Sequence, residues 1–148
     1  MLYFSHSGYA YSKKRCESIV NWFVQEYLPR HKISINVHHK GLAREHVLGW
    51  CWNTDSNSRP RDFEIEIDNQ QCAQVYMETL LHELWHVRQH VMGHLKKTTR
   101  KKFWKGVDHT NKWDDDYDSP WEWEARKMEE ILYTKYHHTT NQLNKCHN

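Results

Sequence analysis

Residues 72–92 read CAQVYMETLLHELWHVRQHVM, and this stretch decides most of what the chain can fold into. Its apolar residues recur at helical spacing, at Tyr76, Leu80, Leu84, Val87 and Val91. At 3.6 residues per turn these side chains form one stripe about 80° wide. The spacing predicts an amphipathic helix that packs one side against a core and ends at Gly93.

The other side of this helix carries His82 and His86. The two side chains are four residues apart, which places them about 40° apart around the helix axis, so both imidazoles can reach one ion. The pair lies about 140° from the centre of the apolar stripe. The helix therefore has a packing side and a side that can hold a metal.

With Glu83 between them, the two histidines complete an HExxH motif, HELWH at residues 82–86. In this motif the histidines bind zinc, and the glutamate is the general base that takes a proton from metal-activated water and passes it to the leaving amine. Zinc also polarises the scissile carbonyl, so the protein needs no covalent nucleophile. The motif predicts a Zn²⁺ cofactor and an enzyme, a metallopeptidase whose partner is a peptide or protein substrate. The alternative is a pair of polar histidines on a solvated helix face.

A catalytic zinc usually takes three protein ligands, and the third has to come from downstream. Metzincins need a glycine at position 89 and a histidine at position 92, but this chain has Gln89 and Met92, which excludes that class. Two acidic candidates, Glu122 and Glu124, begin the last predicted helix. Each lies about 80° from the centre of that helix's apolar stripe, on opposite flanks, so periodicity leaves both open.

Several segments resemble, in order and spacing, the small gluzincin-like metallopeptidases common in phage and bacterial genomes: HELWHVRQ (82–89), FWKG (103–106), Tyr117 and PWEWEA (120–125). The resemblance covers about residues 75–132. It implies a minimal zincin-like fold and makes Glu124 the third zinc ligand, because Glu124 precedes Ala125 as in the gluzincin pattern. Glu122 is the alternative ligand, and its other role would be a carboxylate favoured at a helix N-terminus.

Two further hypotheses stay open. The chain also resembles SprT-like proteases, which act on DNA-bound proteins, and Gly93-His94 would then supply a histidine ligand, with His90 or His109 as lesser candidates. A nucleic-acid partner belongs to that hypothesis. The third hypothesis is a non-catalytic zinc-binding structural or virion protein.

Other residues are candidates for secondary roles at the site. Tyr117 or His109 could stabilise the oxyanion, although the favoured interpretation of each is an ordinary loop residue. Residues 63–68, FEIEID, alternate strictly and are the candidate for an exposed strand edge that holds the substrate, or else a plain half-buried strand.

The remaining periodicity predicts an α+β fold with a small antiparallel or mixed sheet. The sheet packs on an N-terminal helix, the HExxH helix and a C-terminal helix. We expect helices over 14–28, 72–92 and from Pro120, strands over 32–38, 47–52 and 63–68, and an irregular loop from Gly93 to Ser119. That loop has a basic part (96–105) and an acidic part (114–118), which we interpret as solvated; the acidic part lacks the alternating ligands and glycine of a calcium-binding EF-hand loop.

The bulk properties of the chain set limits on these hypotheses. With 148 residues we expect a single domain, with residues 137–148 as a loose tail. The net charge of +2 does not indicate a dedicated nucleic-acid binder. No leader pattern and no apolar run of membrane-spanning length is present, which predicts a cytoplasmic or intracellular protein without a membrane partner, with virion association as the alternative. The four cysteines form no CxxC pair and are expected to be free thiols.

Overall fold

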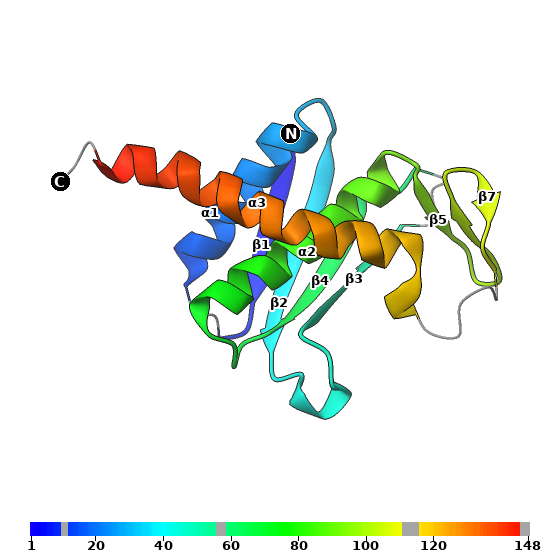
Figure 1. Ribbon diagram of the computed structural model, residues 1–148, viewed down its shortest axis with the longest axis horizontal. Coiled ribbons are helices and arrows are strands. Elements are labelled where there is room, and N and C mark those ends of the chain that lie inside the picture. Colours follow the sequence, from blue (N-terminus) through cyan, green and yellow to red (C-terminus); the bar gives the residue numbers. More distant parts are fainter. Residues whose placement is uncertain (10–11, 56–58, 111–115, 146–148) are drawn as a thin grey trace.

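The computed structural model describes residues 1–148 except 10–11, 56–58, 111–115 and 146–148, and describes no side chain for Asp116 or for residues 141–145. Within this part, helices and strands mix as α+β, which confirms the predicted fold class (Figure 1). The helices are α1 (Lys13–Tyr27), α2 (Ala73–Val91) and α3 (Pro120–Lys145). The strands are β1 (Leu2–Ser7), β2 (Ile33–Lys40), β3 (Gly49–Asn53), β4 (Asp62–Asp68), β5 (Leu95–Lys97), β6 (Lys102–Trp104) and β7 (Val107–Asp108).

The main sheet has the strand order β1-β2-β4-β3 and is mixed, because β1, β2 and β4 run parallel while β3 runs antiparallel to β4. Alternate residues of the two central strands are buried, as their alternation predicts: Ile33, Ile35 and Val37 in β2, and Phe63, Ile65 and Ile67 in β4. These side chains pack into one core with the apolar faces of α1 and α2. The opposite face of the sheet carries mainly polar side chains from β2 and β4, with Tyr3 of β1 and with Trp50 and Trp52 of β3 exposed beside them.

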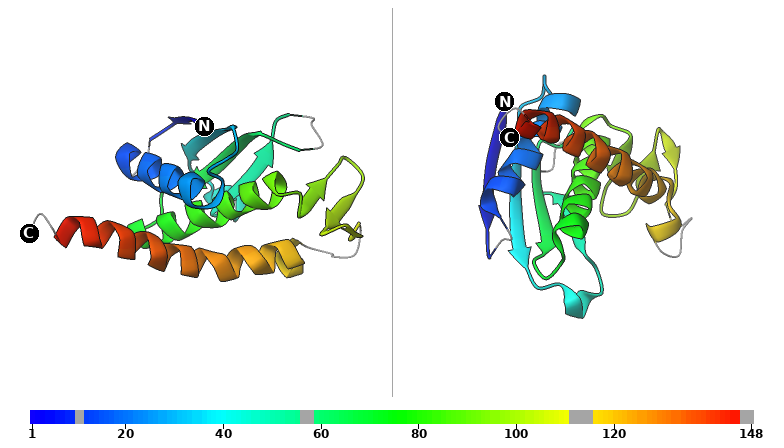
Figure 2. Two further views of the ribbon diagram at one scale, coloured as in Figure 1. Left: turned by 90° about the horizontal axis from the view of Figure 1, so that it is seen from above. Right: turned by 60° about the vertical axis from the view of Figure 1, so that its left-hand side comes forward.

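The third helix forms an outer layer on α2, so the molecule has a sheet, a pair of helices and then α3 (Figure 2). Pro120 suits the first turn of α3, and the hydroxyl of Ser119 accepts a hydrogen bond from the backbone N–H of Glu122. The predicted apolar stripe of α3 is buried at Trp121, Ala125, Leu132 and Tyr136. Helices α2 and α3 therefore meet along the stretch of α2 that contains the HExxH motif.

Two sequence expectations differ from the structure, and the strand β1 was not predicted. The N-terminal residues form the strand β1, and the expected irregular loop after α2 contains the small antiparallel sheet β5-β6-β7. The expected loose tail is helical as far as Lys145, since α3 continues. Asp114, Asp115 and Cys146, on which other expectations rested, lie outside the described residues.

The expected substrate-binding edge at residues 63–68 is wrong. These residues form β4, which pairs with β2 on one side and with β3 on the other, so its backbone hydrogen-bonding groups are occupied. Among the described strands it is β3 that has a free edge on this side of the sheet, and β3 contacts α2. Alternation along a single strand cannot reveal this, because it does not report how many neighbours the strand has.

Two further features are general to the described residues. Among the described residues, no helix combines the length and apolar character needed to cross a bilayer. Cys16, Cys51 and Cys72 are free thiols, as expected.

Candidate metal centre and active site

His82 and His86 from α2 meet Glu122 from the first turn of α3. The Nε2 atom of His82 lies 3.0 Å from Oε2 of Glu122, and Nε2 of His86 lies 2.8 Å from Oε1 of the same carboxylate. One ligand atom from each residue lies within 4.8 Å of the other two. The three side chains are therefore close enough to share one ion.

The structure brings Glu122, the alternative third residue, to the histidine pair and does not bring the expected Glu124 there. Oε1 of Glu124 accepts hydrogen bonds from Nε1 of Trp85 (2.7 Å) and from Nε2 of Gln89 (3.1 Å), on the flank of α3 away from the histidine pair. Glu124 thus holds the two helices together, while Glu122 faces the histidines. Both glutamates are equivalent in the periodicity of α3, and only the way α3 lies across α2 separates them.

The Nδ1 atom of each imidazole, which does not face Glu122, has a hydrogen-bond partner of its own. Nδ1 of His82 lies 2.7 Å from Oε2 of Glu129, and Nδ1 of His86 lies 2.7 Å from Oε1 of Gln89. Gln89 is completely buried, and its Nε2 donates to the carbonyl of Trp121 as well as to Glu124. Since each Nδ1–H donates to an oxygen, each Nε2 can offer its lone pair toward Glu122, which is the arrangement that orients metal-binding histidines.

The donor set fits a zinc ion. Nε2 of His86 is buried and makes no well-aligned hydrogen bond with any described residue, although a carboxylate oxygen lies 2.8 Å away. A buried ring nitrogen without a hydrogen bond is costly unless another partner satisfies it. Two imidazole nitrogens and one carboxylate oxygen are typical ligands of a catalytic zinc.

The charges of the group are strongly coupled. Burial lowers the pKa of His82, but the hydrogen bonds to Glu122 and Glu129 outweigh burial and raise the pKa to about 10. For the carboxyl group of Glu122 burial acts in the other direction and raises the pKa. The contacts with His82 and His86 outweigh burial and hold the pKa of Glu122 far below its ordinary value. Without a metal, a proton on His82 offsets part of the negative charge of the carboxylates, and a bound cation would replace that proton.

Glu83 lies beside this group and is almost completely buried. Burial raises the pKa of its carboxyl group, although the neighbouring charges of His86 and His82 act in the opposite direction. A carboxylate with a raised pKa is a better proton acceptor near neutral pH, as a general base requires. Its position on the same helix as His82 and His86 follows directly from the motif.

A cavity of about 430 Å³ opens onto the group. Glu83 and the three clustered residues line it together with Val47, with Gly49, Trp50 and Cys51 of β3, with His90 of α2, and with Leu95, Lys97 and Tyr117 from the segment after α2. Tyr117 is exposed, with the guanidinium of Arg126 stacked 3.9 Å from the centre of its ring. Residues of the edge strand β3 therefore form one wall of the cavity that contains the HExxH residues.

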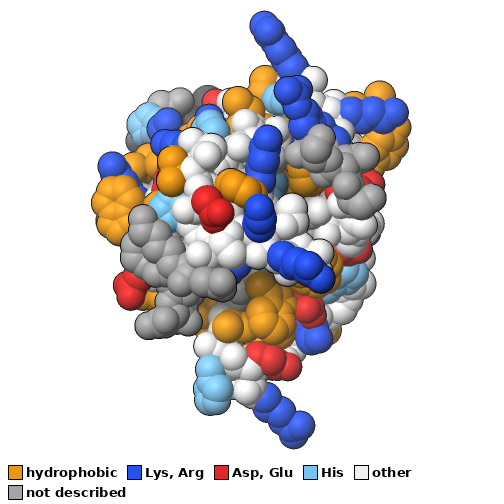
Figure 3. Space-filling view, turned by 90° about the vertical axis from the view of Figure 1, so that its right-hand side faces the viewer, with side chains coloured by type: hydrophobic (Ala, Val, Ile, Leu, Met, Phe, Trp, Pro, Cys, Tyr) orange, Lys and Arg blue, Asp and Glu red, His pale blue; other side chains and the backbone are white. Residues whose placement is uncertain are grey.

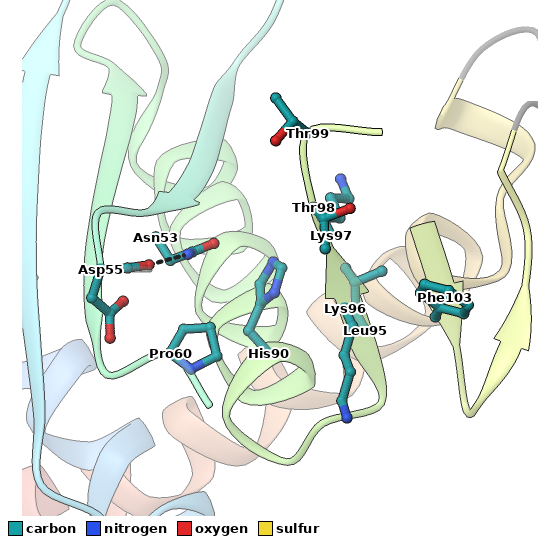
Figure 4. Close-up of a pocket in the computed structure, with 10 residues that line it drawn as sticks. All are labelled: Asn53, Asp55, Pro60, His90, Leu95, Lys96, Lys97, Thr98, Thr99 and Phe103. Carbon is teal, nitrogen blue, oxygen red and sulfur yellow. Dashed lines mark hydrogen bonds between the residues drawn. The ribbon is translucent and has the colours of Figure 1, made fainter. Parts of the chain in front are cut away.

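A second cavity, of about 530 Å³, continues past His90 between the end of β3 and the β5–β6 hairpin. Figure 4 shows the imidazole of His90 between Pro60 on one side and Leu95 on the other. The two cavities share His90, Leu95 and Lys97. Burial is the main reason that the pKa of His90 falls to about 4, so its ring is neutral near pH 7.

The other predicted residues lie outside the three-residue group. The ring of His94 packs edge-on against Trp104, and the ring of His109 packs edge-on against Trp121. Neither residue lines the cavity at Glu83. The basic residues 96–105 belong to the β5–β6 hairpin and the turn after it, at the end of the molecule that Figure 3 faces, where Lys and Arg side chains lie at the surface.

Comparison with known proteins adds no assignment. No protein-family model, curated protein or solved structure matches this chain.

Three residues of this site were not predicted from the sequence: Trp85, Gln89 and Glu129. A signal was available for Glu129, which follows Glu122 by seven residues and so lies on the same face of α3, two turns along. Gln89 follows His86 by three residues, which is also a same-face spacing. Nothing in the sequence shows that Trp85 reaches across to α3.

Proposed function

We propose that this protein is a zinc-dependent peptidase that hydrolyses peptide bonds with His82, His86 and Glu122 as zinc ligands and Glu83 as general base. The observation that carries the proposal is the cluster of His82, His86 and Glu122, partly buried and with two oriented Nε2 atoms, next to Glu83 and open to a cavity. Three protein ligands facing a cavity are typical of catalytic zinc, whereas structural zinc is usually enclosed by four.

Each residue has a defined task in this reaction. A bound zinc ion supplies a Lewis acid, which makes a nearby water acidic and polarises the scissile carbonyl. Glu83 removes the proton from the attacking water and delivers it to the leaving amine. Glu129 and Gln89 hold the two imidazoles in the orientation that ligation requires.

The free edge of β3 supports a peptide as the substrate. An extended chain pairs with such an edge through main-chain hydrogen bonds, which depend little on side-chain identity. Residues of β3 border the cavity that contains Glu83. A chain paired with β3 would therefore pass next to the catalytic group.

The SprT-like alternative receives less support, because His94 lies against Trp104 rather than with the histidine pair. A non-catalytic zinc protein would share the ligands but would not need Glu83 or a cavity. Activity is the property that separates this alternative from the proposal.

The test is cleavage of an unfolded protein by the wild type and by Glu83→Gln, with zinc content measured in both. We expect wild-type cleavage that a chelator abolishes, and a loss of about 10²–10⁴-fold in Glu83→Gln with its zinc retained. Full activity of a zinc-loaded Glu83→Gln would contradict the proposed base. Absence of cleavage by a zinc-loaded wild type would favour the non-catalytic alternative.

A further inference from the structure

A third cavity, of about 480 Å³, lies where the parallel strands begin, beside the turn between α1 and β2 at the top of Figure 1. It shares no residue with the two cavities described above. Its walls are Tyr3, Arg30, His31, Lys32, Ile33, Ser34, Arg61 and Asp62.

Strand register brings these residues together. Tyr3 of β1 pairs with Ser34 of β2, which in turn pairs with Asp62 of β4, so the three lie in a row across the sheet. Their neighbours Ile33 and Phe63 are buried toward the helices, which leaves this row on the polar face. The turn before β2 and the residue before β4 add the cationic side chains.

The cavity is rich in cations without acidic partners. Arg30, Lys32 and Arg61 form no salt bridge with an Asp or Glu in the part of the chain that the structure describes. One acidic residue, Asp62, shares the wall. Burial, followed by the charge of Arg61, lowers the pKa of His31, and Nδ1 of His31 is buried without a hydrogen bond to any described residue.

The remaining wall residues add aromatic and polar groups. The ring of Tyr3 is 54% exposed, and the ammonium of Lys32 lies 5.8 Å from its centre. Guanidinium and ammonium groups bind phosphate oxygens, an exposed aromatic ring stacks on a nucleobase, and hydroxyl or carboxylate groups accept hydrogen bonds from a sugar. The wall offers all three kinds of contact within one cavity.

We infer that this cavity binds a nucleotide, with its phosphate on Arg61, Lys32 and Arg30 and its base on Tyr3. The ligand is either a free nucleoside phosphate or a nucleotide within a single strand, because both present the same phosphate ester and base. The inference does not depend on peptidase activity, since no residue is shared with that site.

The test measures binding of AMP, adenosine, inorganic phosphate and a single-stranded octanucleotide by calorimetry. We expect AMP to bind more tightly than adenosine or phosphate, and Arg61→Gln and Lys32→Gln each to weaken it about tenfold or more. Tyr3→Leu should weaken AMP more than phosphate. If the octanucleotide binds more tightly than AMP through the same residues, the ligand is a strand.

The control is Arg100→Gln with Lys101→Gln, which removes two exposed charges from the β5–β6 hairpin. It should leave binding unchanged. Failure of both AMP and the octanucleotide to bind would overturn the inference, as would an equal loss of binding in the control and in Arg61→Gln.

Discussion

Glu129 is the residue whose role at the site is easiest to isolate. Its carboxylate contacts Nδ1 of His82, and Glu129 is not one of the three residues whose ligand atoms cluster. Glu129→Ala should lower zinc affinity about 10–100-fold, the usual cost of losing a partner that orients a metal-binding histidine. Zinc titration against a competing chelator measures this effect.

The adjacent Glu130 provides the matched control, because it is exposed on the same helix. Glu130→Ala removes the same charge one residue away and should bind zinc as the wild type does. Equal affinities for Glu129→Ala and Glu130→Ala would show that Glu129 does not orient His82.

At the residue scale the sequence predicted part of the site. The HExxH spacing placed His82, Glu83 and His86 together, because four residues span about one helical turn whatever the tertiary fold. Spacing left Glu122 and Glu124 open and the family resemblance favoured Glu124, whereas the residue that meets the histidines depends on how α3 crosses α2. Spacing within one helix carries no information on that crossing.

At the scale of elements, the approach of β3 to α2 depends on Gly49. A Cβ atom at this position would lie 3.0 Å from the carbonyl oxygen of Glu66 and 3.1 Å from a methyl carbon of Thr79. Gly49→Val should therefore push β3 away from the helix and lower the free energy of unfolding by about 1–3 kcal/mol. Urea unfolding measures the change.

Gly41→Ala is the control, because a Cβ atom there would meet nothing within 4 Å. This variant should be as stable as the wild type or slightly more stable. If Gly49→Val unfolds at the same urea concentration as Gly41→Ala, the strand and helix are not in close contact.

Most of the helices and the strands of the main sheet were predictable, because their apolar periodicity is strong. The strands missed were β1 and the short β5, β6 and β7. The last three have two or three residues each, too few for a pattern of period two to appear. The pairing order of the main sheet also depends on contacts between distant residues, so β3 could not be identified as the edge strand.

At the scale of the whole molecule, buried histidines couple stability to pH. His39 is buried, with its ring nitrogens contacting the carbonyl of Ser7 and the hydroxyl of Tyr76. Burial is the main cause of its lowered pKa. The unfolded chain therefore takes up a proton on His39 at a higher pH than the folded protein does.

This proton uptake fixes the sign of the effect. The contribution of His39 to stability is fully present above about pH 6.5 and is lost as the pH falls toward its lowered folded pKa. His39→Gln should reduce the pH dependence of the unfolding free energy below pH 6.5, by at most about 1.4 kcal/mol per pH unit. Urea unfolding of the metal-free protein at several pH values measures both slopes, and identical slopes would contradict the prediction.

The central claim is that His82, His86 and Glu122 bind zinc. The most direct measurement is the zinc affinity of the wild type, Glu122→Ala and Glu124→Ala. Circular dichroism first shows that all three proteins are folded. We predict one zinc per wild-type chain and a loss in Glu122→Ala greater than the roughly 100-fold that a lost orienting partner costs. Glu124→Ala should keep most of its affinity. A wild type without zinc, or a Glu122→Ala variant that binds zinc as tightly as the wild type, would contradict the claim.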